Sequence, residues 1–305
     1  MSVLVVGSIA LDTVKTPVEE HADQLGGSAS YAAVGASFFS PVNLVGVVGE
    51  DFPESEFAFW KSRKIDPGGV QRAAGKTFRW SGEYAWDLNT RETRSVALNV
   101  FEDFRPQLPE YFRDTQFVLL ANIAPSLQAH VLNQMRRPRF VIADTMDLWI
   151  QTTRKDLDAL LPRLDLLILN ESEAREITGD TSLIRAGRAI RRMGPKYVAV
   201  KKGEHGALLF GPDDFFSCGA YPLEDIRDPT GAGDTFAGGL AGYLAGQGAK
   251  QIDFAWLRRA VIFGSVLASF CVEAFSLNRL RCLTSKEIEE RYEMFRVMSQ
   301  FEVLP

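Results

Sequence analysis

Residues 228–240, which read DPTGAGDTFAGGL, combine closely spaced glycines with an aspartate at the start of a small-residue helix. Glycine has no Cβ, so the backbone N–H groups of such a turn can approach an anion closely. The first N–H groups of a helix also lack internal acceptors, and the helix dipole favours negative charge there. Gly231, Ala232 and Gly233 could therefore hold a phosphoryl group, and Asp234 could accept a hydroxyl proton. The chemistry that this run predicts is phosphoryl transfer to an alcohol.

The same run leaves other interpretations open. An N-capped helix with a glycine turn and no bound anion would have a similar sequence. The dinucleotide-binding fingerprint G-x-G-x-x-G would need glycine where Phe236 stands, and it would follow the first strand instead of lying near the C-terminus. The phosphate-binding pattern G-x-x-x-x-G-K-S/T occurs nowhere in the chain, which argues against a kinase of that type.

Composition limits the class of protein. The chain has 305 residues, of which 46% are hydrophobic and 24% charged, as expected for a globular protein with one major and one minor domain. The net charge of −5 argues against a nucleic-acid-binding surface. The three cysteines have no C-x-x-C spacing, which indicates reduced thiols in a cytoplasmic protein. Residues 1–11 lack the basic segment of a signal peptide, and the run 261–272 is too short to span a bilayer, so neither secretion nor a membrane is expected.

Short apolar runs alternate with helical stretches along most of the chain. Such alternation predicts a parallel sheet with helices on both faces, and ligands of such sheets bind beyond the carboxyl ends of the strands. Asp144 and Asn170 lie at two such ends. The expected strands are residues 3–6, 42–49, 117–120, 140–143, 166–169 and 198–200, and the expected helices are 28–39, 53–64, 126–136, 154–161, 171–178, 182–193 and 285–298.

Residues 70–101 have a different pattern, in which aromatic and polar side chains alternate with a period of two. Together with a turn at 89–92, this alternation predicts an antiparallel hairpin with one aromatic face. An isolated hairpin cannot bury such a face in water, so the face must cover a substrate pocket, a second subunit or its own domain. The aromatic residues are Phe78, Trp80, Tyr84 and Trp86.

In this order, the elements resemble the ribokinase-like (PfkB) family of carbohydrate and nucleoside kinases. The family's C-terminal signature, D-x-x-G-A-G-D followed by a small-residue helix, is matched by residues 228–234. Gly26 and Gly27 open a helix similar to the family's G-G-x-x-x-N-x-A element, with Ser30 or Tyr31 where the asparagine is expected. The resemblance extends over nearly the whole chain.

Two further motifs match the family less specifically. Asn170 and Glu173 resemble N-x-x-E, although an asparagine N-cap followed by this glutamate is also close to an ordinary capping box. Lys201, Gly203 and Gly206 resemble T-x-G-x-x-G with lysine in place of threonine, and a simple β-turn is the alternative there.

The resemblance implies roles for these residues. Asp234 would be the catalytic base, and Gly231, Ala232 and Gly233 would form the anion hole for the γ-phosphoryl group of ATP. The acceptor would contact Asp12, Gly26, Gly27, Ser30 and Asp234, although Asp12 could instead satisfy a turn. Asn170 and Glu173 would hold Mg²⁺ through water, and Asp228 would contribute to a monovalent cation site, where the need for K⁺ is open. The nucleotide would lie against Asn170, Glu173, Lys201, Gly203, Gly206, Gly231 and Gly233.

The implied fold is an α/β three-layer sandwich around a mostly parallel sheet, with a small β-sheet lid. Residues 1–12, 26–69 and 102–305 would form the large domain, and residues 13–25 and 70–101 the lid, which in the family often forms a homodimer. The implied activity is ATP-dependent phosphorylation of a hydroxymethyl group on a small sugar or nucleoside. A catalytically silent binding protein on the same fold is the alternative, and the sequence does not choose the acceptor.

Overall fold

The computed structural model describes residues 1–248 and 251–302, and its centre is a nine-stranded sheet. The strand order is β13-β12-β11-β10-β9-β8-β1-β4-β5, in which all pairs are parallel except β11–β12 and β12–β13. The strands β8, β9 and β10 are apolar and buried, as expected for parallel strands covered on both faces. The strands are β1 Val3–Val6, β4 Val42–Val48, β5 Ile65–Arg72, β8 Phe117–Leu120, β9 Phe140–Asp144, β10 Leu166–Asn170, β11 Tyr197–Lys201, β12 Ala207–Phe210 and β13 Phe215–Cys218.

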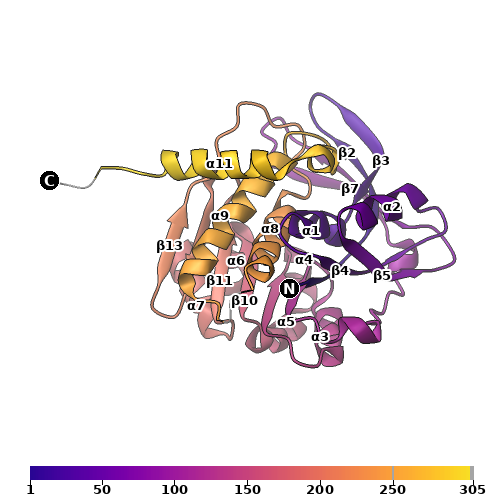
Figure 1. The fold of residues 1–305 in the computed structure, drawn as a ribbon, viewed down its shortest axis with the longest axis horizontal. Helices are drawn as coiled ribbons and strands as arrows, with labels where there is room; N and C mark the ends of the chain where they lie inside the picture. Colours follow the sequence, from indigo (N-terminus) through magenta and orange to yellow (C-terminus); the bar gives the residue numbers. More distant parts are fainter. Residues whose placement is uncertain (249–250, 303–305) are drawn as a thin grey trace.

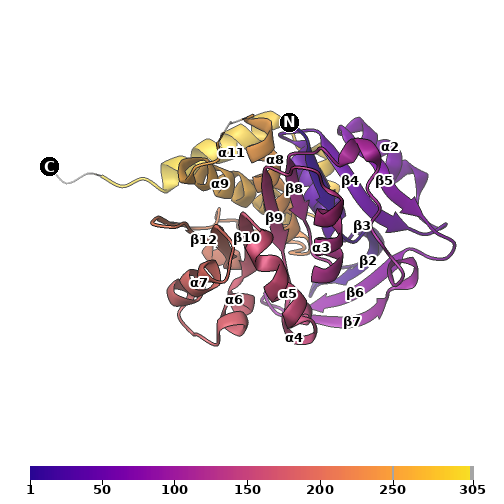
Figure 2. The same ribbon diagram turned by 90° about the horizontal axis from the view of Figure 1, so that it is seen from below.

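Helices cover both faces of this sheet (Figures 1 and 2). One hydrophobic cluster joins the sheet to the first helix layer, and a second cluster joins it to the other layer. The first layer contains α1 Ser28–Ser37, α2 Glu54–Ser62, α8 Ala232–Gly246, α9 Phe254–Cys271, α10 Asn278–Cys282 and α11 Ser285–Met298. The second layer contains α3 Pro125–Gln134, α4 Asp147–Thr152, α5 Arg154–Leu160, α6 Glu171–Thr178 and α7 Leu183–Arg192. The expected α/β three-layer sandwich is confirmed.

Helices α1 and α8 pack at backbone contact, which explains the small residues in both. A Cβ added to Gly238 would lie 2.1 Å from the carbonyl oxygen of Ala32, and one added to Gly242 would lie 2.4 Å from that of Ala36. No side chain larger than hydrogen fits these positions without moving one helix. The packing therefore fixes the start of α8 relative to the diglycine that precedes α1.

A second, four-stranded sheet with the order β3-β2-β6-β7 forms the lid. On its outer face, Glu83 forms ion pairs with Lys15 and Arg94. On its inner face, Val14 and Tyr84 pack with Phe275 of the large domain. The strands are β2 Ala10–Lys15, β3 Glu20–Gly26, β6 Phe78–Tyr84 and β7 Arg91–Ala97.

The strand bounds correct two expectations. The lid sheet begins at Ala10, so the expected start of the lid at residue 13 is wrong. Strand β5 pairs with β4 up to Arg72, so residues 70–72 belong to the large sheet and the expected start of the second lid segment at residue 70 is also wrong. Strand β6 also stops at Tyr84, because a turn follows it. The Asp87 carboxylate closes this turn by accepting the backbone N–H groups of residues 89 and 90. Trp86 thus lies in the turn and is 87% exposed, outside the aromatic face expected for it. The division into two domains stays a prediction.

Helix α9 is the one helix in the described part of the chain that is long and apolar enough to cross a membrane. It begins at Phe254, well before the expected apolar run at 261–272. Half of its 18 residues are buried in the structure, where Leu257, Val261 and Leu267 join the main hydrophobic cluster. A core helix of this kind passes the same length and composition test, so α9 is weak evidence for a membrane span.

Candidate active site

The carboxyl ends of β9, β10 and β11 meet the start of α8 at one edge of the large sheet. Asp144 ends β9, and Lys201 ends β11 two strands away. The Lys201 Nζ lies 2.9 Å from Asp144 Oδ2 and 3.2 Å from Oδ1. A Cβ added to Gly233 would lie 3.0 Å from the same Nζ. The lysine therefore links a buried carboxylate to the first turn of α8.

The turn that starts α8 has a conformation that requires glycine. Gly231 has a φ of +76°, and a Cβ there would lie 2.3 Å from the ring of Tyr31. Asp228, which is 1% exposed, anchors the turn by accepting the N–H groups of Thr230 and Ser276. In the first turn of α8 the Ala232 N–H donates to the Pro229 carbonyl at 3.3 Å, whereas the N–H groups of Gly233 and Asp234 have no acceptor among the described residues and are available for an anion.

Asp234 lies in that first turn, next to groups of both charges. Burial and the nearby Asp144 raise the pKa of its carboxyl, Lys201 and Arg91 lower it, and the net result is a pKa of about 7. A carboxylate that titrates near neutrality is suited to general base catalysis. The roles of the anion turn and of Asp234 in catalysis stay predictions.

Asp12 and the diglycine lie together at the start of α1. The Gly27 N–H donates to Asp12 Oδ2 at 3.4 Å, and a Cβ on Gly26 would overlap the Asp12 carboxyl group. Asp12 Oδ1 is buried without a partner in the described part of the chain, and burial raises the pKa of this carboxyl to about 7. An acceptor hydroxyl is the kind of group that such an oxygen can bind.

The two candidates for the missing asparagine are placed differently. Ser30 is fully buried, and its hydroxyl has no partner among the described residues, so its role in acceptor binding stays a prediction. Tyr31 packs against Gly231 and interacts electrostatically with Asp12 and Asp228, and burial raises the pKa of its phenol. Tyr31 therefore lies closer to the site than the sequence alone indicated.

Asn170 and Glu173 form the capping box that the sequence left as an alternative. The Asn170 side chain accepts the Glu173 N–H at 2.9 Å, and Glu173 Oε2 accepts the Asn170 N–H at 2.7 Å. Burial raises the pKa of Glu173 to about 8, while Lys201 lowers it and Asp144 raises it. With a pKa of about 8, Glu173 keeps its proton at neutral pH unless a cation near it stabilises the charged form. The role in Mg²⁺ binding stays a prediction.

Between β11 and β12 the chain forms a short 3₁₀ helix at Gly203–His205 instead of a simple β-turn, and Gly203 and Gly206 have φ values of +54° and +87°. A Cβ on Gly206 would lie 2.1 Å from the carbonyl oxygen of Cys218, so packing alone requires glycine there. The lid reaches this turn, since Asn89 Nδ2 donates to Glu204 Oε1 at 3.1 Å. The contact of these glycines with a nucleotide stays a prediction.

Two residues at the site were missed by the sequence reasoning. Asp144 was noted only as a strand end, and its lysine partner was assigned to the nucleotide alone. Arg91 was placed in a turn, but it begins β7 and interacts with Asp12 and Asp234. Position at a strand end could have identified Asp144, whereas nothing in the local sequence marks Arg91.

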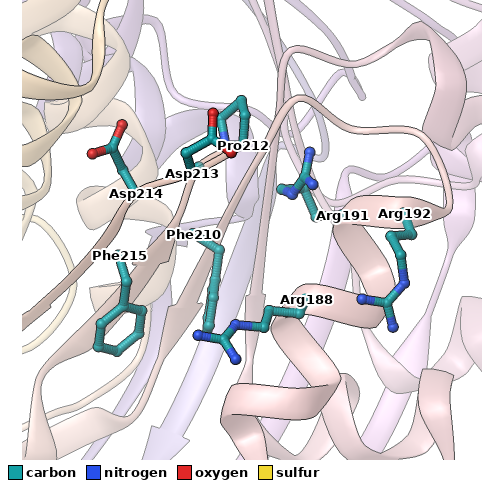
Figure 3. A pocket seen from close by; sticks show the side chains of 9 residues that line it. Arg188, Arg191, Arg192, Phe210, Pro212, Asp213, Asp214 and Phe215 are labelled. Atoms are coloured by element: carbon teal, nitrogen blue, oxygen red, sulfur yellow. The ribbon is translucent and has the colours of Figure 1, made fainter.

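A cavity of about 200 Å³ between α7 and the β12–β13 hairpin contains none of these residues. Figure 3 shows Arg188, Arg191 and Arg192 on one side and Phe210 and Phe215 on the other. Phe210 pairs with Val198 near the amino end of β11, so this cavity lies at the edge of the sheet away from the site.

Comparison with known proteins identifies the family. Residues 2–280 match the pfkB family of carbohydrate kinases. The chain belongs to this family. It is 32% identical over 269 residues to the cytidine kinase of Thermococcus kodakarensis, an alignment that covers 85% of this chain and 95% of that protein. It is therefore an ATP-dependent kinase that acts on a hydroxyl group of a sugar or nucleoside.

Solved structures have the same fold. The nucleoside kinase of Methanocaldococcus jannaschii has a TM-score of 0.76 at 19% identity, with 96% of this chain and 98% of that chain covered. A putative ribokinase II from E. coli, in complex with ATP and Mg²⁺, also has a TM-score of 0.76, at 18% identity and with 96% and 99% covered. Use of ATP and Mg²⁺ follows from the kinase family. No group of three or more histidine, cysteine or acidic side chains that could hold a metal occurs within the described residues.

Proposed function

We propose that this kinase phosphorylates the hydroxymethyl group of a nucleoside. The observation that carries the phosphoryl-transfer assignment is Asp234, a half-buried residue in the first turn of α8 whose carboxyl has its pKa raised to about 7. The nucleoside class is supported by the cytidine kinase relative and by the inner face of the lid, where Trp80 offers a flat aromatic surface. A sugar acceptor is the alternative within the same family.

In the proposed reaction, the hydroxymethyl oxygen forms a bond to the γ-phosphorus of ATP as the bond to the β,γ-bridging oxygen breaks. Asp234 takes the hydroxyl proton, and ADP leaves with the bridging oxygen. The N–H groups at Gly231, Ala232 and Gly233, with the Lys201 ammonium beside them, stabilise the negative charge on the transferring group. Asp12, Gly26, Gly27 and Ser30 hold the acceptor.

On the nucleotide side, Asn170 and Glu173 would hold Mg²⁺ through water, and Lys201, Gly203 and Gly206 would lie against the phosphates. When bound, the ion offsets the charge of the phosphate oxygens. Both Asp228 oxygens accept backbone N–H groups, yet each carboxylate oxygen has a second lone pair for a monovalent cation. We include K⁺ only as a proposal for this loop.

The remaining features are proposed from the sequence and the lid. The exposed edge strand β7 offers a surface for a homodimer through the lid. The three free cysteines favour a cytoplasmic location, and the net charge of −5 does not favour nucleic acid as a partner. No membrane partner is proposed.

The test is an ADP-release screen of purified protein against nucleosides, pentoses and hexoses, with Asp234→Asn as the decisive variant. We expect this variant to lose ~10²–10⁴-fold in kcat while ATP binding is retained, as for loss of a positioned base. Asp213→Asn, which changes an exposed aspartate on the β12–β13 hairpin, is the matched control. Wild-type kcat in Asp234→Asn would refute the assignment of the base, and no ADP release by the wild type with any acceptor would favour the silent binding protein.

A further inference from the structure

Four basic side chains other than histidine lie on the strands of the lid, and one of them differs from the rest. Lys15 and Arg94 pair with Glu83, and Arg79 pairs with aspartates at 23 and 51. Arg91 has no ion pair within the described part of the chain, although the carboxylates of the active site are near it. A cation that is left unpaired beside carboxylates is available for an anionic ligand.

The register of the lid strands places Arg91 on the face that covers the site. Arg91 pairs across β6–β7 with Tyr84, and Val14 of β2 pairs with Gly82 of β6. Tyr84 and Val14 belong to the inner cluster with Phe275, whereas Glu83, one residue away from Tyr84, belongs to the outer face. Because successive strand residues point to opposite faces, Arg91 shares the inner face with Tyr84.

Arg91 has two aromatic neighbours on β6, and one of them contacts its guanidinium. Its Cζ lies 5.2 Å from the ring centroid of Trp80, within the range of a cation–π contact. Arg91 is the cross-strand neighbour of Tyr84, whose hydroxyl accepts a hydrogen bond from Thr230 Oγ1 at 3.2 Å. Thr230 directly precedes Gly231, so this chain of contacts joins the lid arginine to the anion turn.

We propose that Arg91 is a catalytic residue supplied by the lid, whose guanidinium contacts the transferring phosphoryl group and the phosphate of the product on the acceptor side. This inference rests on the proposed function. Asp12 on β2 of the lid interacts electrostatically with Asp228 and Asp234 of the large domain, and all three carboxylates would repel a phosphate that arrives there. Lys201 offsets this charge from the nucleotide side, and Arg91 offsets it from the lid. Arginine suits the task because its planar fork binds phosphate oxygens in pairs.

The lid contacts give the proposal a consequence for closure. Among the contacts between the lid and the large domain are the Tyr84–Thr230 and Asn89–Glu204 hydrogen bonds, which lie beside the site, as well as the Arg79–Asp51 ion pair. Opening of the lid would break both hydrogen bonds and withdraw Arg91 from the carboxylates. Phosphoryl transfer would then require the closed lid, which keeps an activated phosphoryl group from water.

The experiment compares Arg91→Ala with Arg94→Ala, which removes the same group from the outer face of the same strand. For Arg91→Ala we expect kcat to fall by ~10²–10³-fold, the usual effect of removing one donor to a developing anion, with little change in the KM for ATP. Added guanidinium ion should restore part of the activity of Arg91→Ala, and Arg91→Lys should retain more activity than the alanine variant. Arg94→Ala should keep wild-type kcat and should not respond to guanidinium.

The outcomes separate this inference from the function on which it rests. If the wild type transfers no phosphoryl group to any acceptor, the proposed function fails and takes the role of Arg91 with it. If the wild type and Arg94→Ala are active and Arg91→Ala has the same kcat, only the role of Arg91 is overturned. A third outcome would also overturn the role of Arg91. If kcat falls equally in Arg91→Ala and Arg94→Ala, and neither added guanidinium nor Arg91→Lys restores it, both arginines act only by stabilising the lid.

Discussion

Replacement of Lys201 by methionine tests the charge balance of the site. The side chains of Lys201 and Asp144 are 19% and 5% exposed, so the pair is largely shielded from water. Removal of one partner from a buried ion pair leaves the other charge uncompensated, at a cost of about 3–5 kcal/mol. Methionine keeps most of the length and the apolar stem of lysine, so little of this loss would come from packing. We therefore expect Lys201→Met to be about 3–5 kcal/mol less stable than the wild type at pH 8.

The loss should depend on pH in a direction that the structure fixes. Burial raises the pKa of Glu173 from 4.5 to about 8 and of Asp234 from 3.8 to about 7, and Lys201 lowers both. A carboxyl whose folded pKa is raised gives stability that is fully present below its unfolded pKa and lost as pH rises through the folded pKa. Without Lys201 these folded pKa values rise further, so each group costs more stability in alkaline solution. The difference between wild type and variant should thus be largest at pH 8–9 and small near pH 4.

Urea denaturation across this pH range measures the effect, with two controls. Lys202→Met changes the adjacent lysine, which has no ion pair among the described residues, and should cost less than ~0.5 kcal/mol. The double variant Lys201→Met with Asp144→Asn removes both charges and should be more stable than Lys201→Met alone, because no unpaired carboxylate remains at 144. Equal stability of the two lysine variants, or a loss in Lys201→Met that is the same at every pH, would refute this account of the site.

Three further predictions concern the metal, the base and the lid. Glu173→Gln should raise the MgCl₂ concentration that gives half-maximal rate at fixed ATP. If the dependence on MgCl₂ is unchanged and the free energy of unfolding falls by at most ~1 kcal/mol, Glu173 acts only as part of the helix cap. The kcat/KM of the wild type should rise with pH through about 7, as Asp234 loses its proton and becomes a base; a rate independent of pH between 5 and 9 would contradict this. Intrinsic fluorescence should respond to acceptor in Trp86→Phe, which keeps Trp80 on the inner face, and much less in Trp80→Phe; the reverse order would place the acceptor elsewhere.

The sequence predicted the large domain well because its signals are local. Runs such as residues 166–169 are apolar throughout, and only a strand covered on both faces is buried in that way. The glycines of residues 231–242 likewise predict a turn and a close helix contact, and Gly231, Gly238 and Gly242 each occupy such a place. These features depend on residues near one another in the chain.

The lid and the charged pairs were harder to predict because they depend on long-range register. The alternation through Trp86 suggested a strand, but the Asp87 turn ends β6 earlier, and this shift moves Arg91 from a turn to the first residue of β7. The pairing of Lys201 with Asp144 depends on the strand order, in which β9 and β11 flank β10. No local sequence pattern indicates this order. Thus the motif residues and the strand-end position of Asp144 could be identified from sequence, but the pairing of Asp144 with Lys201 and the place of Arg91 could not.

One property of the site accounts for several of its features together. Asp12, Glu173 and Asp234 each have a raised pKa, and in each case burial is the largest cause. Burial is useful for Asp234, because a base that titrates near 7 holds a transferred proton better than an exposed aspartate would. The same burial leaves an excess of negative charge, which must be offset before a phosphate can approach. Lys201 offsets it in the large domain, and Arg91 can do so only when the lid contacts at Thr230 and Glu204 are made. In this arrangement the charge that makes Asp234 an effective base also makes the reaction depend on a closed lid.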